Sequence, residues 1–331
     1  MLPCLSLWLG LVSLAAAEVA DIEREAVEYR RAIRSGEVIV RRDDPNGRAA
    51  ELHIWWDGDS FRQDVSSGNG YRVVDVWHQG QYLHFSDEPS DNGNKLVATV
   101  ADANDRGAVG SKQPSDPRRI GMAAVDFLNL VHYPLDEVLT NPARKNTTVR
   151  QDQLAGQECT LVTITRVNGG IIRVWIAPER DFSVLRMDCE ISDGRGTKSF
   201  DTVDVEVALH EPSGLWFPVH SHCRNGVNDR IDCDEDCTIQ VISLNQPIPP
   251  EVFTFAGIGV PVGWPVSDHT RPDIDRQLAW DGQAVVTVER AADTARAATR
   301  TNVIYLAGAL VLAAVALVLL WRFFSLRRAN G

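Results

Sequence analysis

The sequence lacks the short motifs by which many enzymes are recognised. It contains no G-x-S-x-G nucleophile elbow, no H-E-x-x-H zinc motif, no P-loop and no G-x-G-x-x-G opening a helix. Carboxylates are abundant, but no spacing among them singles out an acid–base pair. We therefore expect no catalytic residue and no cofactor, and an enzyme is the class of function that the sequence favours least.

An excess of basic residues is also missing. The chain has 33 Lys and Arg against 45 Asp and Glu, which gives a formal net charge of −12. Binding to nucleic acid depends on clustered positive charge, so we expect no nucleic-acid partner. In a protein outside the cytoplasm, excess negative charge more often indicates solubility than a preference for a ligand.

Charge is absent from one long segment near the C-terminus. No charged residue lies between Arg300 and Arg322, and Val303–Trp321 is apolar throughout. A bilayer core about 30 Å thick is crossed by roughly 20 helical residues. Because arginines follow directly, residues 303–324 are predicted to form a single transmembrane helix and residues 325–331 a cytoplasmic tail.

The N-terminus has the pattern of an export signal. The apolar run Leu5–Leu14 is too short to span a membrane, and Ala15-Ala16-Ala17 offers a cleavage site before Glu18. Lys and Arg are missing before this run, and the alternative interpretation is a buried N-terminal helix. We expect residues 1–17 to be a signal peptide, residues 18–267 an extracytoplasmic (periplasmic) domain, and residues 268–302 a polar stalk leading to the cell membrane.

The middle of the chain is dominated by strand signals. Short runs rich in β-formers alternate with Gly, Asn and Asp clusters such as Ser67-Gly68-Asn69-Gly70. Helices are predicted over residues 18–35 and from Asp116-Pro117 onward. The pattern predicts a mainly β (α+β) fold with one large curved antiparallel sheet or open half-barrel covering helices. The predicted strands are residues 38–42, 52–56, 61–65, 71–78, 82–86, 96–100, 148–153, 160–167, 171–177, 184–191, 203–209, 215–223 and 230–244.

The end of the strand region resembles a known family. Asn245-Gln246-Pro247-Ile248-Pro249 is followed by Val252-Phe253-Thr254-Phe255 and then by Gly263-Trp264-Pro265-Val266-Ser267-Asp268. This order is similar to the closing motif of the LolA-like lipoprotein-carrier superfamily. The resemblance covers roughly residues 18–268 and implies an unclosed barrel that encloses an apolar cavity for acyl chains. The chain departs from soluble carriers in its predicted membrane anchor and in the insert Gly257–Pro261, and no individual binding residue is carried over.

Alternation along the predicted strands gives candidate positions for such a cavity. Side chains two residues apart on a strand share a face, and the predicted second helix supplies a cover. Filling of the sheet's core is an equally good explanation for these large residues. The candidates are Leu52, Ile54, Trp56, Phe61, Tyr71, Val73 and Trp77 from the strands, with Phe127 and Val131 from the helix.

A group of histidines and cysteines looks like a zinc site when it is read as a string. His220 and His222 stand beside Cys223, and Cys233 and Cys237 follow. Strand alternation separates them, because it places the cysteines on the inward face and the histidines on the outward one. We therefore expect no metal site.

The inward cysteines could instead form a disulfide. A hairpin centred near residue 228 would place Cys223 opposite Cys233, within bonding distance, and exported cysteines are often oxidised. We predict a Cys223–Cys233 disulfide and expect Cys159 and Cys189 to be buried thiols. The role of Cys237 stays open.

Two classes of function are consistent with these features. The first is a membrane-anchored binding module, a carrier or sensor whose partner is a lipid or a lipoprotein acyl chain. The second is a non-catalytic interaction or signalling domain with a filled core, whose partner is another protein. An apolar void on the concave side of the sheet would favour the first class, and tightly packed side chains would favour the second.

Overall fold

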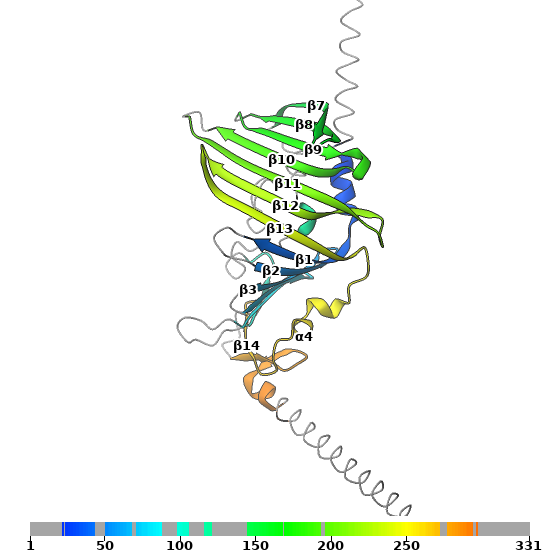
Figure 1. Cartoon of the computed structure of the whole chain (residues 1–331). Helices are drawn as coiled ribbons and strands as arrows, with labels where there is room; N and C mark the ends of the chain where they lie inside the picture. Colours follow the sequence, from blue (N-terminus) through cyan, green and yellow to red (C-terminus); the bar gives the residue numbers. More distant parts are fainter. Residues whose placement is uncertain are drawn as a thin grey trace, which may run out of the picture.

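The computed structural model describes the central part of the chain (Figure 1). The predicted signal peptide, transmembrane helix and cytoplasmic tail lie outside the described residues. Within the described residues, no helix is long and apolar enough to cross a membrane. The described residues are 22, 24–43, 50–67, 71–87, 98–105, 116–120, 144–167, 169–192, 196–271, 277–293 and 296.

One sheet of sixteen strands forms the architecture, in the order β16-β15-β14-β6-β5-β4-β3-β2-β1-β13-β12-β11-β10-β9-β8-β7. Neighbouring strands pair antiparallel, except β6 and β14, which pair in parallel. The strands are β1 Ser35–Asp43, β2 Ala50–Asp57, β3 Ser60–Ser67, β4 Arg72–His78, β5 Gln81–Ser86, β6 Ala98–Asp102, β7 Arg144–Leu154, β8 Gln157–Arg166, β9 Ile171–Ala177, β10 Ser183–Ser192, β11 Lys198–His210, β12 Leu215–Val227, β13 Arg230–Leu244, β14 Pro265–Asp268, β15 Leu278–Trp280 and β16 Val285–Thr287.

The predicted fold class is confirmed as a mainly β protein with a large open curved sheet and few helices (Figure 1). The predicted stalk is partly wrong. Residues 278–287 form β15 and β16, which extend the sheet beyond β14. Trp280 of β15 is only 7% exposed, so the folded domain continues at least 20 residues past the boundary expected at Ser267.

Two meanders join at a single seam. Strands β1 to β6 pair with their neighbours in sequence, and so do β7 to β13. The seam lies between β1 and β13, where Gly36 pairs with Leu244 and Val40 with Ile239. The sheet is therefore built mainly from local hairpins, with two long-range pairings, β1 with β13 and β6 with β14.

The two faces of the sheet carry separate cores. The larger core includes Val40, Trp56, Val174 and Met187 and lies on the face that we call the inner face. The smaller core covers β4 to β6 on the opposite, outer face and includes Trp280. Successive side chains of one strand therefore serve different cores, as strand geometry requires.

A helix over residues 24–32 packs on the inner face, and Ala26 and Ile33 are almost fully buried. The sequence predicted its end at Ser35-Gly36, but Ser35 already begins β1. Asn245 explains the earlier end, because its side chain accepts a hydrogen bond from the Arg34 amide and donates one to the Ala32 carbonyl. These backbone groups bond to a residue 211 positions away rather than to another helical turn.

The predicted second helix begins as expected. Asp116 caps the 3₁₀ turn η1, Pro117–Arg119, by accepting a hydrogen bond from the Arg118 amide at 2.9 Å. Ile120 follows and is 5% exposed. The remainder of that helix, with Phe127 and Val131, lies outside the described residues.

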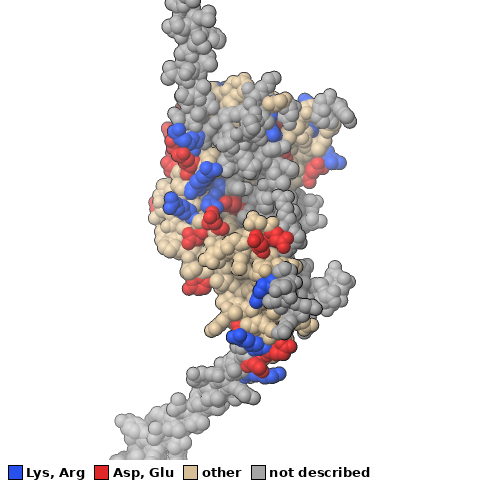
Figure 2. All heavy atoms as spheres, turned by 180° about the vertical axis from the view of Figure 1, so that it is seen from behind, with Lys and Arg blue, Asp and Glu red and all other residues tan. Residues whose placement is uncertain are grey.

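Basic and acidic side chains are interspersed over the described surface (Figure 2). Many of them pair locally, as Arg271 does with Asp268 and Arg296 with Asp293. Paired charges of this kind form a solvated surface and do not produce a large electrostatic potential of one sign.

Candidate functional site

The inner face of β2 and β3 carries four of the predicted cavity residues. Leu52, Ile54 and Trp56 are fully buried, and Phe61 is 4% exposed. All four belong to the larger core. Alternation therefore placed these side chains on the correct face, next to the helix that covers it.

The remaining predicted strand positions lie toward the edge of the same face. Trp77 is half-buried and meets the edge of the Phe61 ring at a centroid distance of 6.0 Å. Val73 is half-buried in β4, where it pairs with Val65. Tyr71 precedes β4 and is half-buried. Phe127 and Val131 lie outside the described residues, so the candidate cavity is described here only by its strand side.

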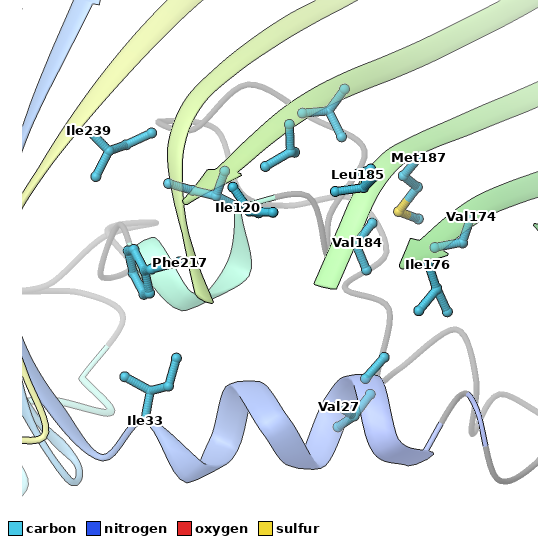
Figure 3. Close-up of a cluster of buried hydrophobic side chains, with 14 of the residues drawn as sticks. Val27, Ile33, Ile120, Val174, Ile176, Val184, Leu185, Met187, Phe217 and Ile239 are labelled. Carbon is cyan, nitrogen blue, oxygen red and sulfur yellow. The ribbon is translucent and has the colours of Figure 1, made fainter. Parts of the chain in front are cut away.

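Side chains from distant strands meet the helix at the centre of this face. In Figure 3, Val27 of the helix and Ile33, which directly follows it, point toward Phe217, Ile176 and Ile239 from the strands. The helix contributes only a few of the buried residues in the larger core, whereas the strands from β1 to β13 contribute most of them. The apolar surface of the sheet is thus much wider than the stripe of the described helix.

Two stacked aromatic rings in this core each have a guanidinium group over them. The rings of Trp56 and Phe217 stack with centroids 6.1 Å apart. The guanidinium carbon of Arg30 lies 5.7 Å from the Phe217 centroid, and that of Arg118 lies 5.9 Å from the Trp56 centroid. Both distances are within the range of cation–π attraction.

The two arginines differ in their partners. Arg118 donates to both carboxylate oxygens of Asp116 at distances of 2.8 to 3.0 Å. Arg30 is 3% exposed, and none of its three guanidinium nitrogens has a hydrogen-bond partner among the described residues. Burial lowers the pKa of Arg30 to about 10, which still leaves it cationic at neutral pH.

A polar group closes the inner face at β4 and β5. Asp75 is 4% exposed and accepts hydrogen bonds from the Tyr82 hydroxyl at 2.5 Å and from Gln63 at 3.3 Å. His84 Nδ1 lies 2.8 Å from the same carboxylate. Burial, followed by the charge of Asp75, raises the pKa of Tyr82 well above its ordinary value. The tyrosine is therefore a neutral donor that solvates a buried carboxylate.

The inward cysteines gather around a second buried charge. Glu235 is 2% exposed and pairs with Arg42. The thiols of Cys233 and Cys237 lie 3.6 and 3.7 Å from its two oxygens. Burial and the charge of Glu235 raise the pKa of Cys237 to about 12, so this thiol is protonated at neutral pH.

The predicted Cys223–Cys233 disulfide is wrong for this structure. All five described cysteines, which include Cys159 and Cys189, are free thiols, and Cys223 pairs with Glu235 rather than with Cys233. The turn lies between Val227 and Arg230, half a residue beyond the predicted centre, and a bulge beside Gly226 shifts the register once more, so that Cys233 pairs with Asn225. Cys223 and Cys233 are therefore diagonal neighbours, about 7–8 Å apart in such a ladder and beyond normal disulfide geometry.

The histidines lie on the outer face, as alternation predicted. His222 Nε2 is 2.6 Å from Asp234, and His220 Nε2 is 3.2 Å from Asp236. No group of His, Cys, Asp or Glu among the described residues is arranged to hold a metal ion. These pairs are partly exposed cross-strand contacts.

The segment from Asn245 to Asp268, which we call the closing segment, folds across the outer face. Thr254 caps helix α4, Phe255–Ile258, after the 3₁₀ turn η3, Pro250–Phe253. Phe253 and Phe255 are buried in the smaller core. The apolar residues of the motif therefore cover the back of β4 to β6 rather than line the inner face.

Two arginines hold the closing segment in place. Arg62 donates to the carbonyls of Val252 and Gly257, and Arg72 donates to the carbonyl of Ile258. Both guanidinium groups also bind Asp64, which is 8% exposed. The motif thus depends on a buried charge network supplied by β3 and β4.

A pocket of about 490 Å³ opens between the closing segment and the added strands β15 and β16. Its apolar wall includes Leu83, Phe253 and Trp280, and its rim includes Gln283 and Arg271. Arg271 is paired with Asp268 at 2.6 Å, so the rim carries little unbalanced charge from this pair. The pocket lies on the outer face, away from the predicted cavity residues.

Sequence reasoning missed the charged members of these sites. Arg30 stands in a helix rich in exposed charge, and Arg62 and Glu235 alternate with ordinary strand residues. A signal for Arg30 was its place four residues after Ala26 and three before Ile33, on the stripe that packs against the sheet. Long polar side chains were assigned to solvent, because most of them lie there.

Comparisons with known proteins find only distant likenesses. No protein-family model matches the chain, and no curated protein matches it. One similar solved structure is a putative outer membrane lipoprotein-sorting protein domain from Vibrio parahaemolyticus, with 10% identity over 70% of this chain and 95% of that one, and a TM-score of 0.38. Another is the lipoprotein LppX of Mycobacterium tuberculosis, with 10% identity over 70% of this chain and 98% of that one, and a TM-score of 0.28. Scores this low establish neither a family nor a function for this chain.

Proposed function

We propose that the protein is a membrane-anchored extracytoplasmic binding module that holds a lipid or a lipoprotein acyl chain on the inner face of its sheet. The observation that carries the proposal is the continuous apolar surface there, which runs from β1 to β13 and includes Leu52, Ile54, Trp56 and Phe61. An acyl chain needs a long apolar surface that is shielded from water. Of this core's buried residues, the helix over residues 24–32 contributes Ala26 and Val27, whereas the strands contribute most.

The anchoring part of the proposal rests on the sequence. The uncharged segment Val303–Trp321 and the short apolar run Leu5–Leu14 support an exported domain tethered to the cell membrane. The closing-segment resemblance to lipoprotein carriers supports the same ligand class. The proposal includes no catalytic step.

An interaction domain with a filled core is the second candidate. It is favoured by the complete burial of Val38, Val40, Leu52 and Trp56, which is also what a packed core requires. The outer pocket and the outward strand surface would then meet a protein partner. Detection of bound lipid separates the two candidates.

The test compares lipid content in two matched variants of the full chain. Trp77→Gln places an amide on the inner face, and Trp55→Gln places one on the outer face of the neighbouring region, where Trp55 packs against the smaller core. Each protein is purified from its own membrane, and bound acyl chains are extracted and counted by mass spectrometry. An uncompensated amide costs about 1–3 kcal/mol, which corresponds to a loss of affinity of about 5- to 150-fold.

We expect acyl chains in stoichiometric amounts with the wild type and with Trp55→Gln, and markedly less with Trp77→Gln. A wild-type protein that is folded and free of lipid would refute the binding module and favour the interaction domain. Equal loss in both variants would place the lipid elsewhere than on the inner face.

A further inference from the structure

Arg30 carries a buried charge that makes no hydrogen bond to any described residue and so has no evident role in stabilising the fold. The side chain is 3% exposed, and its Nε, Nη1 and Nη2 atoms make no hydrogen bond to a described group. Buried guanidinium groups are normally paired, since an unpaired charge is costly to desolvate. A folded protein that keeps such a group has a use for it.

The surroundings leave this charge unbalanced. Tyr29 and Asp116 are the groups whose charge acts on Arg30. Tyr29 is neutral at ordinary pH, because burial raises its pKa to about 12. Asp116 gives its carboxylate oxygens to Arg118. Among the described residues, two buried or half-buried cations thus share one carboxylate, and the surplus positive charge belongs to Arg30.

The position of the surplus charge relates it to the proposed acyl site. Arg30 lies over Phe217, which stacks on Trp56, one of the predicted cavity residues. The ring can attract the cation, but it offers no acceptor in the plane of the guanidinium, where the N–H groups point. The three donor nitrogens therefore lie beside the apolar surface without a described acceptor.

We infer that Arg30 binds the anionic head of the lipid, so that the ligand is a carboxylate- or phosphate-bearing acyl lipid rather than a neutral one. This inference rests on the proposed acyl-binding function. A carboxylate or phosphate can take two parallel hydrogen bonds from one guanidinium group. Its tail would then extend over the apolar face beside Trp56, and its charge would balance that of Arg30.

The experiment uses two probes that share one acyl chain. cis-Parinaric acid carries a carboxylate, and its methyl ester does not, while both fluoresce when they enter an apolar site. Each is titrated into the purified full chain, held in amphipol after its own lipid has been removed. Lysophosphatidic acid and a monoacylglycerol of matched chain length then compete with the bound probe, which separates a phosphate head from a carboxylate one.

The variants are Arg30→Met, which keeps an unbranched side chain but removes the charge, and Arg31→Met as its exposed neighbour on the same helix. We expect the wild type to bind the acid about 10- to 100-fold more tightly than the ester. Arg30→Met should bring the acid close to the ester and leave the ester unweakened. Arg31→Met should change neither. Without lipid, the melting temperature of Arg30→Met should equal or exceed that of the wild type, because an unpaired buried charge has been removed.

Three results would overturn the inference, and they differ in what else they affect. If the wild type binds acid and ester equally, Arg30 does not select charge, and the acyl-binding function still stands. If Arg30→Met melts well below the wild type and loses both probes alike, the side chain serves the fold. If neither probe binds to the wild type, the proposed acyl-binding function fails together with this inference.

Discussion

Replacing Asp64 with alanine should loosen the closing segment at its attachment to β3 and β4. Asp64 accepts from Arg62 at 2.6 and 2.7 Å and from Arg72 at 3.0 and 2.5 Å. The same two guanidinium groups reach the backbone carbonyls of Val252, Gly257 and Ile258. Without the carboxylate, two neighbouring cations would face each other across a buried space.

The expected loss of stability follows from how deeply the two arginine partners of Asp64 are buried. Removing one member of a buried ion pair typically costs about 3–5 kcal/mol. The Arg62 side chain is 7% exposed and lies 4.5 Å from the Trp55 centroid, whereas Arg72 is 34% exposed and can be hydrated again. We therefore expect a loss at the lower end of that range, about 3 kcal/mol in the free energy of unfolding.

Urea denaturation followed by tryptophan fluorescence measures this loss, and limited proteolysis shows where it acts. The matched control is Asp232→Ala, because Asp232 pairs with Arg230 at side-chain exposures of 41% and 75%. Exposed pairs of this kind contribute about 0–1 kcal/mol. New cleavage should appear within the closing segment of Asp64→Ala only. If both variants lose the same stability, the network does not hold the segment and the reasoning is wrong.

Three further outcomes are expected. In the native protein at neutral pH, the half-buried Cys233 should react with a maleimide and the 3% exposed Cys237 should not. Peptide mapping without reductant should find both cysteines as free thiols. A disulfide-linked peptide would contradict the strand register described above. Gly36→Ala should lower the free energy of unfolding by about 1–3 kcal/mol, because a Cβ at this position would lie 2.4 Å from the fully buried Trp56 ring. A melting temperature equal to that of the wild type would show that the ring can move. Protease added to intact spheroplasts should digest the folded domain and spare the segment from Val303 onward, and an intact full-length chain would exclude the predicted topology.

Most of the sheet could be predicted from alternation alone. The thirteen strands expected from the sequence appear as β1 to β13, and the bounds of β9 and β13 agree to the residue. Their signal is local, since β-branched and apolar residues repeat at every second position. The same rule placed Leu52, Ile54, Trp56 and Phe61 on one face.

Features decided by contacts between distant residues could not be predicted. The turn position and the bulge beside Gly226 together separate Cys223 from Cys233. The need for glycine there appears only in the folded hairpin, where a Cβ at Gly226 would meet the Arg230 carbonyl. The strands β15 and β16 have three residues each, which is too short for a periodic signal. The burial of Arg30 without a described hydrogen-bond partner could not be foreseen either, because charge balance in a core depends on which side chains meet there.

The strand order has a consequence for how the chain folds. Each meander can form hairpin by hairpin from neighbours in sequence, so that little chain entropy is spent on each closure. The seam between β1 and β13 is different, because the residues that bond beside it, Arg34 and Asn245, are 211 positions apart. We expect it to form late, because its partners lie farther apart along the chain than those of β6 and β14, the other long-range pairing in the sheet. Until it closes, both meanders present an unpaired strand of matching register, and two chains that meet at this stage could exchange halves into a domain-swapped dimer.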